Sequence, residues 1–139
     1  MNDEGQSERI EQLIGALRDD NEALREHAIA SLSQLGEEAI EPLIGLMADE
    51  DVLIREAATI AVVHIGPSVV DRLIEAMDDD EWAIREQAAS GLGKLKDPRG
   101  VDPLVKAQKD KDGAVRRAAV WALERIGDAR AVPGLVEAL

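Results

Sequence analysis

The chain repeats one pattern four times, and this repetition limits its possible folds more than any other feature. An aliphatic residue followed by Arg recurs every 30 or 31 residues, at Leu24-Arg25, Ile54-Arg55, Ile84-Arg85 and Val115-Arg116. An Asp stands six residues before each Arg, an Ala stands three after it, and aliphatic residues stand seven and ten after it. A period of this length indicates an array of small units, none of which buries its apolar face alone.

Each unit is predicted to be a hairpin of two helices. In the first half, apolar residues recur at i, i+3, i+4 and i+7, which is one face of an α-helix. Pro42 and Pro103 are expected just inside the starts of their helices, where a missing N–H costs nothing. The second helix ends at a Gly in three units and at Lys96 in the third, where the Asp-Pro-Arg-Gly sequence that follows is expected to end the helix; the glycines are Gly36, Gly66 and Gly127.

The second helix has two distinct faces when positions are counted from the repeated Arg. At 100° per residue, positions −1, +3, +6, +7 and +10 share one sector and are expected in the core. Positions +1, +5 and +8 point the opposite way, toward solvent or a partner. The sequence therefore predicts one all-α domain over residues 1–139, with repeats at 8–38, 39–68, 69–99 and 100–130 and a half repeat at 131–139.

Charge and composition narrow the possible partners and the location. The net charge is −13, and residues 1–93 hold 22 acidic and 6 basic side chains, which would repel nucleic acid and anionic membranes. There is no Cys, no apolar run long enough to span a membrane, and no basic-then-apolar start, so we expect a cytoplasmic protein. Residues 94–139 carry a net +3, and the half repeat has no second helix to cover it. Either this short helix is itself the lid, or its outer side meets a missing continuation or another chain, which allows self-association through the C-terminal end.

The repeated residues resemble a known family. The pattern Asp-x5-Arg-x2-Ala-x3-Leu-x2-Leu/Ile-Gly, followed by Pro-Leu-Ile or Pro-Leu-Val, is similar to HEAT-like repeats of the type found in phycobilin lyases, and the resemblance covers residues 8–139. It implies a right-handed α-solenoid whose second helices line a concave face. It also implies a ladder of Asp and Arg side chains along the stack, formed here by Asp19, Arg25, Asp49, Arg55, Asp79, Arg85, Asp110 and Arg116.

The ladder residues are interpreted as structural, because catalytic groups converge on one point and these recur in every unit. The two histidines, His27 and His64, occupy different positions of their second helices, and a metal site needs several ligands at defined geometry. The sequence therefore predicts no catalytic residue, no metal site and no cofactor.

The outward face of the second helices is the predicted binding site. Acidic residues with exposed apolar side chains among small ones are typical of an interface, so we expect a non-catalytic scaffold that binds another protein, in particular a basic segment, on the concave face. The alternative is a bilin lyase-like enzyme or enzyme accessory subunit, as the family resemblance implies. The predicted protein-binding residues are Glu26, Ala30, Glu56, Ile60, Val63, Trp82, Glu86, Ser90, Arg117 and Trp121.

Overall fold

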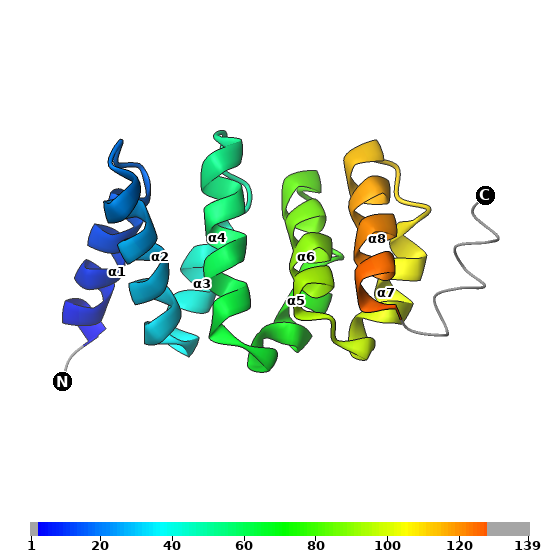
Figure 1. Ribbon diagram of the computed structural model, residues 1–139, viewed down its shortest axis with the longest axis horizontal. Helices are drawn as coiled ribbons and strands as arrows, with labels where there is room; N and C mark the ends of the chain where they lie inside the picture. Colours follow the sequence, from blue (N-terminus) through cyan, green and yellow to red (C-terminus); the bar gives the residue numbers. More distant parts are fainter. Residues whose placement is uncertain (1–2, 128–139) are drawn as a thin grey trace. The chain divides into compact units, whose positions relative to one another are not determined.

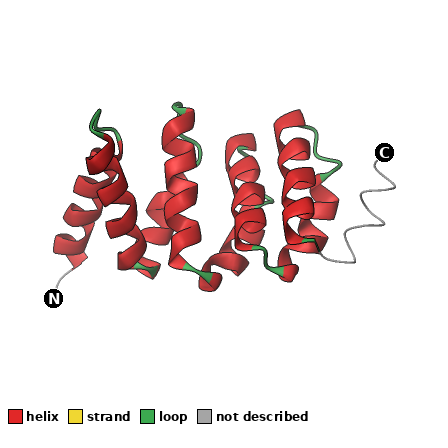
Figure 2. Ribbon diagram, viewed as in Figure 1, coloured by secondary structure: helices red, strands yellow, loops and turns green. Residues whose placement is uncertain are grey.

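The computed structural model of the protein describes residues 3–127. These residues form eight α-helices and two short 3-10 helices and contain no β-strand (Figures 1 and 2). The chain divides into two compact units, residues 1–65 and residues 66–139. The predicted half repeat, residues 131–139, lies outside the described residues.

The first unit contains two helical hairpins that pack side by side. Helices α1 (Asp3–Leu17) and α2 (Glu22–Leu35) form the first hairpin, and α3 (Glu37–Leu46) and α4 (Val52–Ile65) form the second. Helix α2 contacts α4, so the second helices of the two hairpins lie next to each other (Figure 1).

The second unit repeats this arrangement with shorter first helices. A 3-10 turn, η1 (Pro67–Val69), leads into α5 (Val70–Ala76), which pairs with α6 (Trp82–Leu95). A second 3-10 turn, η2 (Pro98–Gly100), leads into α7 (Val101–Ala107), which pairs with α8 (Gly113–Ile126). The most extensive packing in this unit is between α6 and α8.

The core of each unit is built from the repeated apolar positions. The Ala three residues after each Arg is fully buried, and so is the aliphatic residue seven after it; these residues are Ala28, Leu32, Ala58, Val62, Ala88, Leu92, Ala119 and Leu123. Small side chains at +3 and larger aliphatic ones at +7 together make a close-packed interior. The predicted fold class, an all-α stack of HEAT-like hairpins, is confirmed within each unit.

Leu24 departs from the predicted core. It is 48% exposed, whereas Ile54 and Val115 at the same repeat position are buried. Ile54 lines the same surface hollow as Leu17 of the hairpin before it. Among the described residues no hairpin precedes α1 and α2, so the equivalent side of α2 is uncovered at Leu24.

Two helix ends also differ from expectation. Pro103 is the third residue of α7, as predicted, but Pro42 lies inside α3, which already begins at Glu37. In the second unit a 3-10 turn occupies the residues that form the first turn of α3 in the first unit. Lys96 caps α6 in the left-handed conformation, with φ 54° and ψ 34°, so it takes the role that Gly127 has at the end of α8.

In both units position +8 faces the next hairpin. The placement predicted for Ser33 and Gly93, toward solvent or a partner, is therefore wrong. Ser33 Oγ donates a hydrogen bond to the main-chain oxygen of Ala61 on α4, at 3.0 Å. Gly93 lies against Ala122 of α8, where an added Cβ would stand 2.7 Å from the Ala122 Cα atom. Position +8 therefore sets how closely adjacent second helices pack.

Taken singly, none of the described helices is long and apolar enough to span a membrane; Val52–Ile65 and Pro67–Ala76 meet such a test only when counted together.

Candidate functional site

The repeated Asp and Arg residues close the turn inside every hairpin. In each one, Arg Nη1 donates a hydrogen bond of 2.7–2.8 Å to the main-chain oxygen of the Asp six residues earlier. The same Asp side chain accepts a bond of 2.8–3.0 Å from the N–H two residues further on, just before the second helix begins. Four copies of one turn thus hold the two helices of each hairpin together at this end.

The contacts between hairpins differ between the units. In the second unit, Arg85 pairs with Asp110 of the next hairpin, with Nε–Oδ2 at 2.9 Å and Nη2–Oδ1 at 3.2 Å, and the side chains are only 8% and 14% exposed. In the first unit, Asp49 pairs with Arg18, which follows α1, and Arg25 closes its own turn instead.

These ion pairs shift the pKa values of the groups involved. The hydrogen bond from Arg18 lowers the pKa of Asp49. At Asp110, burial opposes ionisation, but the hydrogen bonds from Arg85 and from the Asp112 N–H outweigh it and lower the pKa. Both carboxylates are therefore held in the charged form as part of the packing between hairpins. In the described part of the chain, no group of three or more His, Asp or Glu side chains is placed to hold a metal ion.

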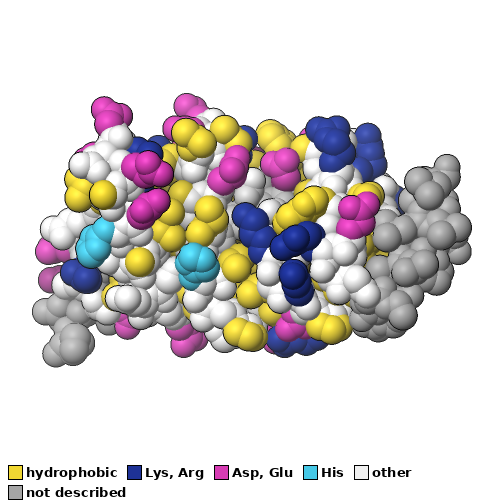
Figure 3. Space-filling view, in the orientation of Figure 1, with side chains coloured by type: hydrophobic (Ala, Val, Ile, Leu, Met, Phe, Trp, Pro, Cys, Tyr) yellow, Lys and Arg dark blue, Asp and Glu magenta, His cyan; other side chains and the backbone are white. Residues whose placement is uncertain are grey.

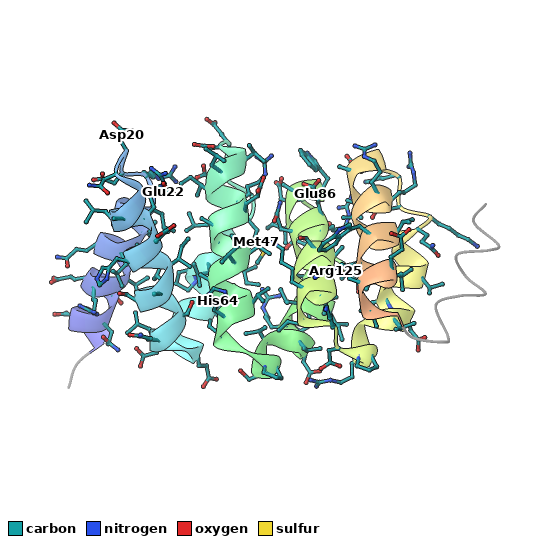
Figure 4. All side chains as sticks on the ribbon, viewed as in Figure 1. Asp20, Glu22, Met47, His64, Glu86 and Arg125 are labelled. Carbon is teal, nitrogen blue, oxygen red and sulfur yellow. The ribbon has the colours of Figure 1, made fainter. Side chains whose placement is uncertain are left out.

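The first unit has a groove between α2 and α4, which we call the α2–α4 groove. Its volume is about 630 Å³. Six carboxylates and two guanidinium groups line it, namely Asp19, Asp20, Glu22, Glu26, Asp51, Glu56, Arg18 and Arg25. Its apolar lining consists of Leu17, Ile29, Leu53, Ile54, Ala57 and Ile60. Figure 4 shows Asp20 and Glu22 at the same end of α2, and Figure 3 shows acidic and apolar side chains together over α2 and α4.

The structure brings together three of the predicted binding residues in this groove. Glu26, Glu56 and Ile60 line it, because positions +1 and +5 of adjacent second helices border the same space. Ala30 is exposed on α2 and Val63 is half-buried on α4, and neither lines the groove.

The predicted binding residues of the second unit form a separate, smaller site on α8. Arg117 and Trp121 line a shallow hollow of about 350 Å³ together with Arg116, Val120 and Glu124; we call it the α8 hollow. Trp121 is 39% exposed, and the Arg125 guanidinium lies 5.6 Å from its ring centroid, a cation–π distance. Trp82 at the start of α6 is 41% exposed, and Glu86 and Ser90 are half-buried on α6; these three do not line the α8 hollow.

Sequence reasoning missed Leu53 and Ile29, which form much of the apolar side of the α2–α4 groove. Leu53 is 69% exposed, the largest value among the exposed large apolar residues. A signal for it exists in the sequence, because the equivalent residues of the other three units are all Ala: Ala23, Ala83 and Ala114. A large apolar side chain that replaces Ala at one copy of an uncovered position is a candidate contact.

Residues 5–63 and 70–139 match the family model of HEAT repeats, so the chain belongs to the HEAT-repeat family. It is similar to a chain in the complex of CpcE and CpcF of phycocyanin lyase from Nostoc sp. PCC7120, with a TM-score of 0.62 and 24% identity over 92% of this chain and 86% of that chain. No curated protein sequence matches it.

Two further solved structures are artificial repeat or engineered proteins. An engineered protein matches with a TM-score of 0.49 and 22% identity over 99% of this chain and 68% of that chain. A designed armadillo repeat protein in complex with the peptide (KR)4 matches with a TM-score of 0.41 and 23% identity over 91% of this chain and 69% of that chain.

Proposed function

We propose that the protein is a non-catalytic scaffold that binds another protein, and that the α2–α4 groove takes a basic partner segment carrying apolar side chains. HEAT-like repeats are typical of interaction scaffolds. The observation that supports the finer proposal is the lining of this groove, where six carboxylates face two guanidinium groups around an apolar surface. Lysine or arginine side chains of the partner would meet the carboxylates, and its aliphatic side chains would cover Leu53, Ile29 and Ile60.

The two guanidinium groups of the groove bond to partners other than the six carboxylates that line it. The negative charge of these carboxylates therefore remains available to a cationic partner. Arg18 pairs with Asp49, and Arg25 Nη1 bonds the main-chain oxygen of Asp19. Glu26 and Glu56 are exposed on neighbouring helices. On this proposal the repeated Asp and Arg residues are structural, and they hold the hairpins at the register that places these two carboxylates on one groove.

The test measures binding of a fluorescein-labelled octapeptide in which lysine and leucine alternate, by fluorescence anisotropy, with a glutamate–leucine octapeptide for comparison. We expect binding of the lysine peptide alone, weakened as NaCl rises from 50 to 300 mM. The variant E26K/E56K should lose at least ten-fold in affinity. Leu53→Asp, at a mostly exposed position, should lose affinity without loss of helicity.

The matched control is E8K/E11K, which makes the same change of charge on the exposed surface of α1, outside the groove. It should bind the lysine peptide within two-fold of the unaltered protein. Equal loss of binding in E8K/E11K and E26K/E56K would mean that the peptide responds to net charge only, and the groove would be rejected as its site.

The alternative of a bilin lyase-like enzyme or accessory subunit is supported by fold similarity alone. Incubation of the protein with free bilin tests it directly. A shift in the visible absorbance of the bilin that depends on protein concentration would favour this alternative over the scaffold.

A further inference from the structure

Helix α8 has exposed basic and apolar side chains, which are the features expected of a partner that binds the α2–α4 groove. Arg117, Trp121 and Arg125 lie four residues apart along α8, so their side chains follow one row on the helix surface. All three are exposed, and Trp121 and Val120 supply apolar surface between the guanidinium groups. Glu124 is the acidic residue of the α8 hollow. In Figure 3, Lys and Arg side chains gather over the α8 end of the second unit.

The row on α8 and the groove also match in length. From Arg117 to Arg125 the helix rises about 12 Å, at 1.5 Å per residue. From Leu53 to Ile60, the two apolar residues that bound the α4 side of the groove, α4 rises about 10 Å. A single helical row of this length fits a helix-in-groove contact, in which residues at i, i+4 and i+8 enter one groove.

We propose that α8 of a second copy of this chain occupies the α2–α4 groove, so that self-association competes with capture of the partner segment. The proposal rests on the proposed function, since it uses the same groove. Arg117 and Arg125 of one molecule meet carboxylates of the other molecule's groove, Glu26 and Glu56 among them, while Trp121 covers the apolar surface between Leu53 and Ile60. Groove and α8 are different surfaces, so the contact is head to tail and each molecule offers one of each.

The contact area is small, which fixes the conditions of the test. Stable interfaces bury about 1,200–2,000 Å² in total, and one helix in this groove buries less, so we expect dissociation constants in the range of about 10–500 μM. The average mass, measured by sedimentation equilibrium from 10 μM to 1 mM, should rise with concentration in 50 mM NaCl and should fall back toward one chain in 500 mM NaCl.

Charge reversal identifies the surfaces. R117E/R125E and E26K/E56K should each remain monomeric at concentrations where the unaltered protein associates. R117E/R125E leaves Arg116 and its bond to the Asp110 main chain in place, so the hairpin turn is preserved. The control K94E/K106E makes the same reversal at exposed lysines outside the α8 hollow and should associate normally.

Combining both reversals in one chain, E26K/E56K/R117E/R125E, should restore association, because the opposite charges then face each other again. A misfolded variant would not recover in this way. A constant mass of one chain up to 1 mM, or association that survives R117E/R125E, would overturn the proposal.

The peptide assay separates this inference from the proposed function. R117E/R125E retains the groove, so it should bind the lysine–leucine octapeptide at least as tightly as the unaltered protein, and that peptide should dissociate the unaltered assembly. Peptide binding without self-association would reject only the α8 contact, whereas absence of both would reject the groove.

Discussion

Gly93 allows α6 and α8 to pack at short range, and replacing it with Ala tests that contact directly. The added Cβ would stand 2.7 Å from Ala122 Cα, 2.8 Å from Ala122 Cβ and 2.9 Å from Trp121 Cζ3. Carbon atoms in contact sit at about 3.5–4.0 Å, so the two helices must separate by roughly 1 Å at this point. The nearest atom is backbone, so a side-chain rotation alone does not relieve the overlap.

The size of the effect follows from two opposing contributions. Overpacking of this kind costs about 1–3 kcal/mol. Replacing Gly with Ala in a helix returns about 1 kcal/mol through backbone entropy and propensity. Because the overlap involves the backbone of α8, we expect the upper half of the overpacking range and a net loss of about 1–2 kcal/mol. For a unit of this size the midpoint of thermal unfolding should fall by roughly 5–15 °C.

Tryptophan fluorescence during thermal or urea unfolding reports on the second unit, which contains Gly93. Both tryptophans, Trp82 and Trp121, belong to the second unit, whereas far-ultraviolet circular dichroism follows helices in both. The matched control is Gly45→Ala in α3, where an added Cβ meets nothing within 4 Å. That variant should gain about 0.5–1 kcal/mol.

A Gly93→Ala protein that unfolds at or above the midpoint of the unaltered protein would refute the reasoning, provided that Gly45→Ala shows its gain. It would mean that the contact between α6 and α8 relaxes without cost.

Three further changes in stability are expected, each measured by urea unfolding. Asp110→Asn should lower the free energy of unfolding by roughly 2–4 kcal/mol, because it leaves the buried Arg85 guanidinium without its carboxylate. Asp78→Asn, in an exposed pair with Lys106, is the control and should change it by less than about 0.5 kcal/mol. Similar losses in the two variants would contradict the role of burial. Lys96→Gly should raise the free energy of unfolding by about 0.5–1 kcal/mol, because it removes a non-Gly residue from the left-handed conformation. A lower free energy of unfolding would show that contacts of the Lys96 side chain stabilise the fold by more than its backbone conformation destabilises it. The pKa values of Asp97 and Asp110 are lowered in the folded protein. The two carboxylates therefore stabilise the fold fully above about pH 4, and this contribution should disappear as pH falls through the lowered pKa values. A midpoint of urea unfolding that is the same at pH 5 and pH 2.5 would contradict this.

The helices and most of the core were predictable because they depend on local periodicity. The spacing of apolar residues around Arg55 or Arg116 places Ala58, Val62, Ala119 and Leu123 in the interior, and the structure buries all four. Each of these positions lies on the apolar stripe of its own helix, so the pattern within one repeat is enough to predict it.

Contacts between hairpins were less predictable, because they depend on which residues occupy the side of a helix that faces a neighbour. Ser33 and Gly93 share position +8, yet one donates a hydrogen bond across the contact and the other permits a close backbone approach. Helical angles alone assigned both to the side that faces solvent or a partner. The α2–α4 groove was predicted in part, through Glu26, Glu56 and Ile60, and its remaining apolar surface required knowing how far apart α2 and α4 lie.

The hydrogen bonds from each repeated Arg to the main chain span only six residues, and they recur in all four hairpins. Every hairpin thus contains, within a short stretch around its turn, the interactions that bend the chain back on itself. Folding can then begin at any of four sites, because closing so short a loop costs little entropy and local contacts favour fast folding. A substitution that disables one such turn leaves three others to start the process, so the refolding rate should be far less sensitive to it than the final stability is.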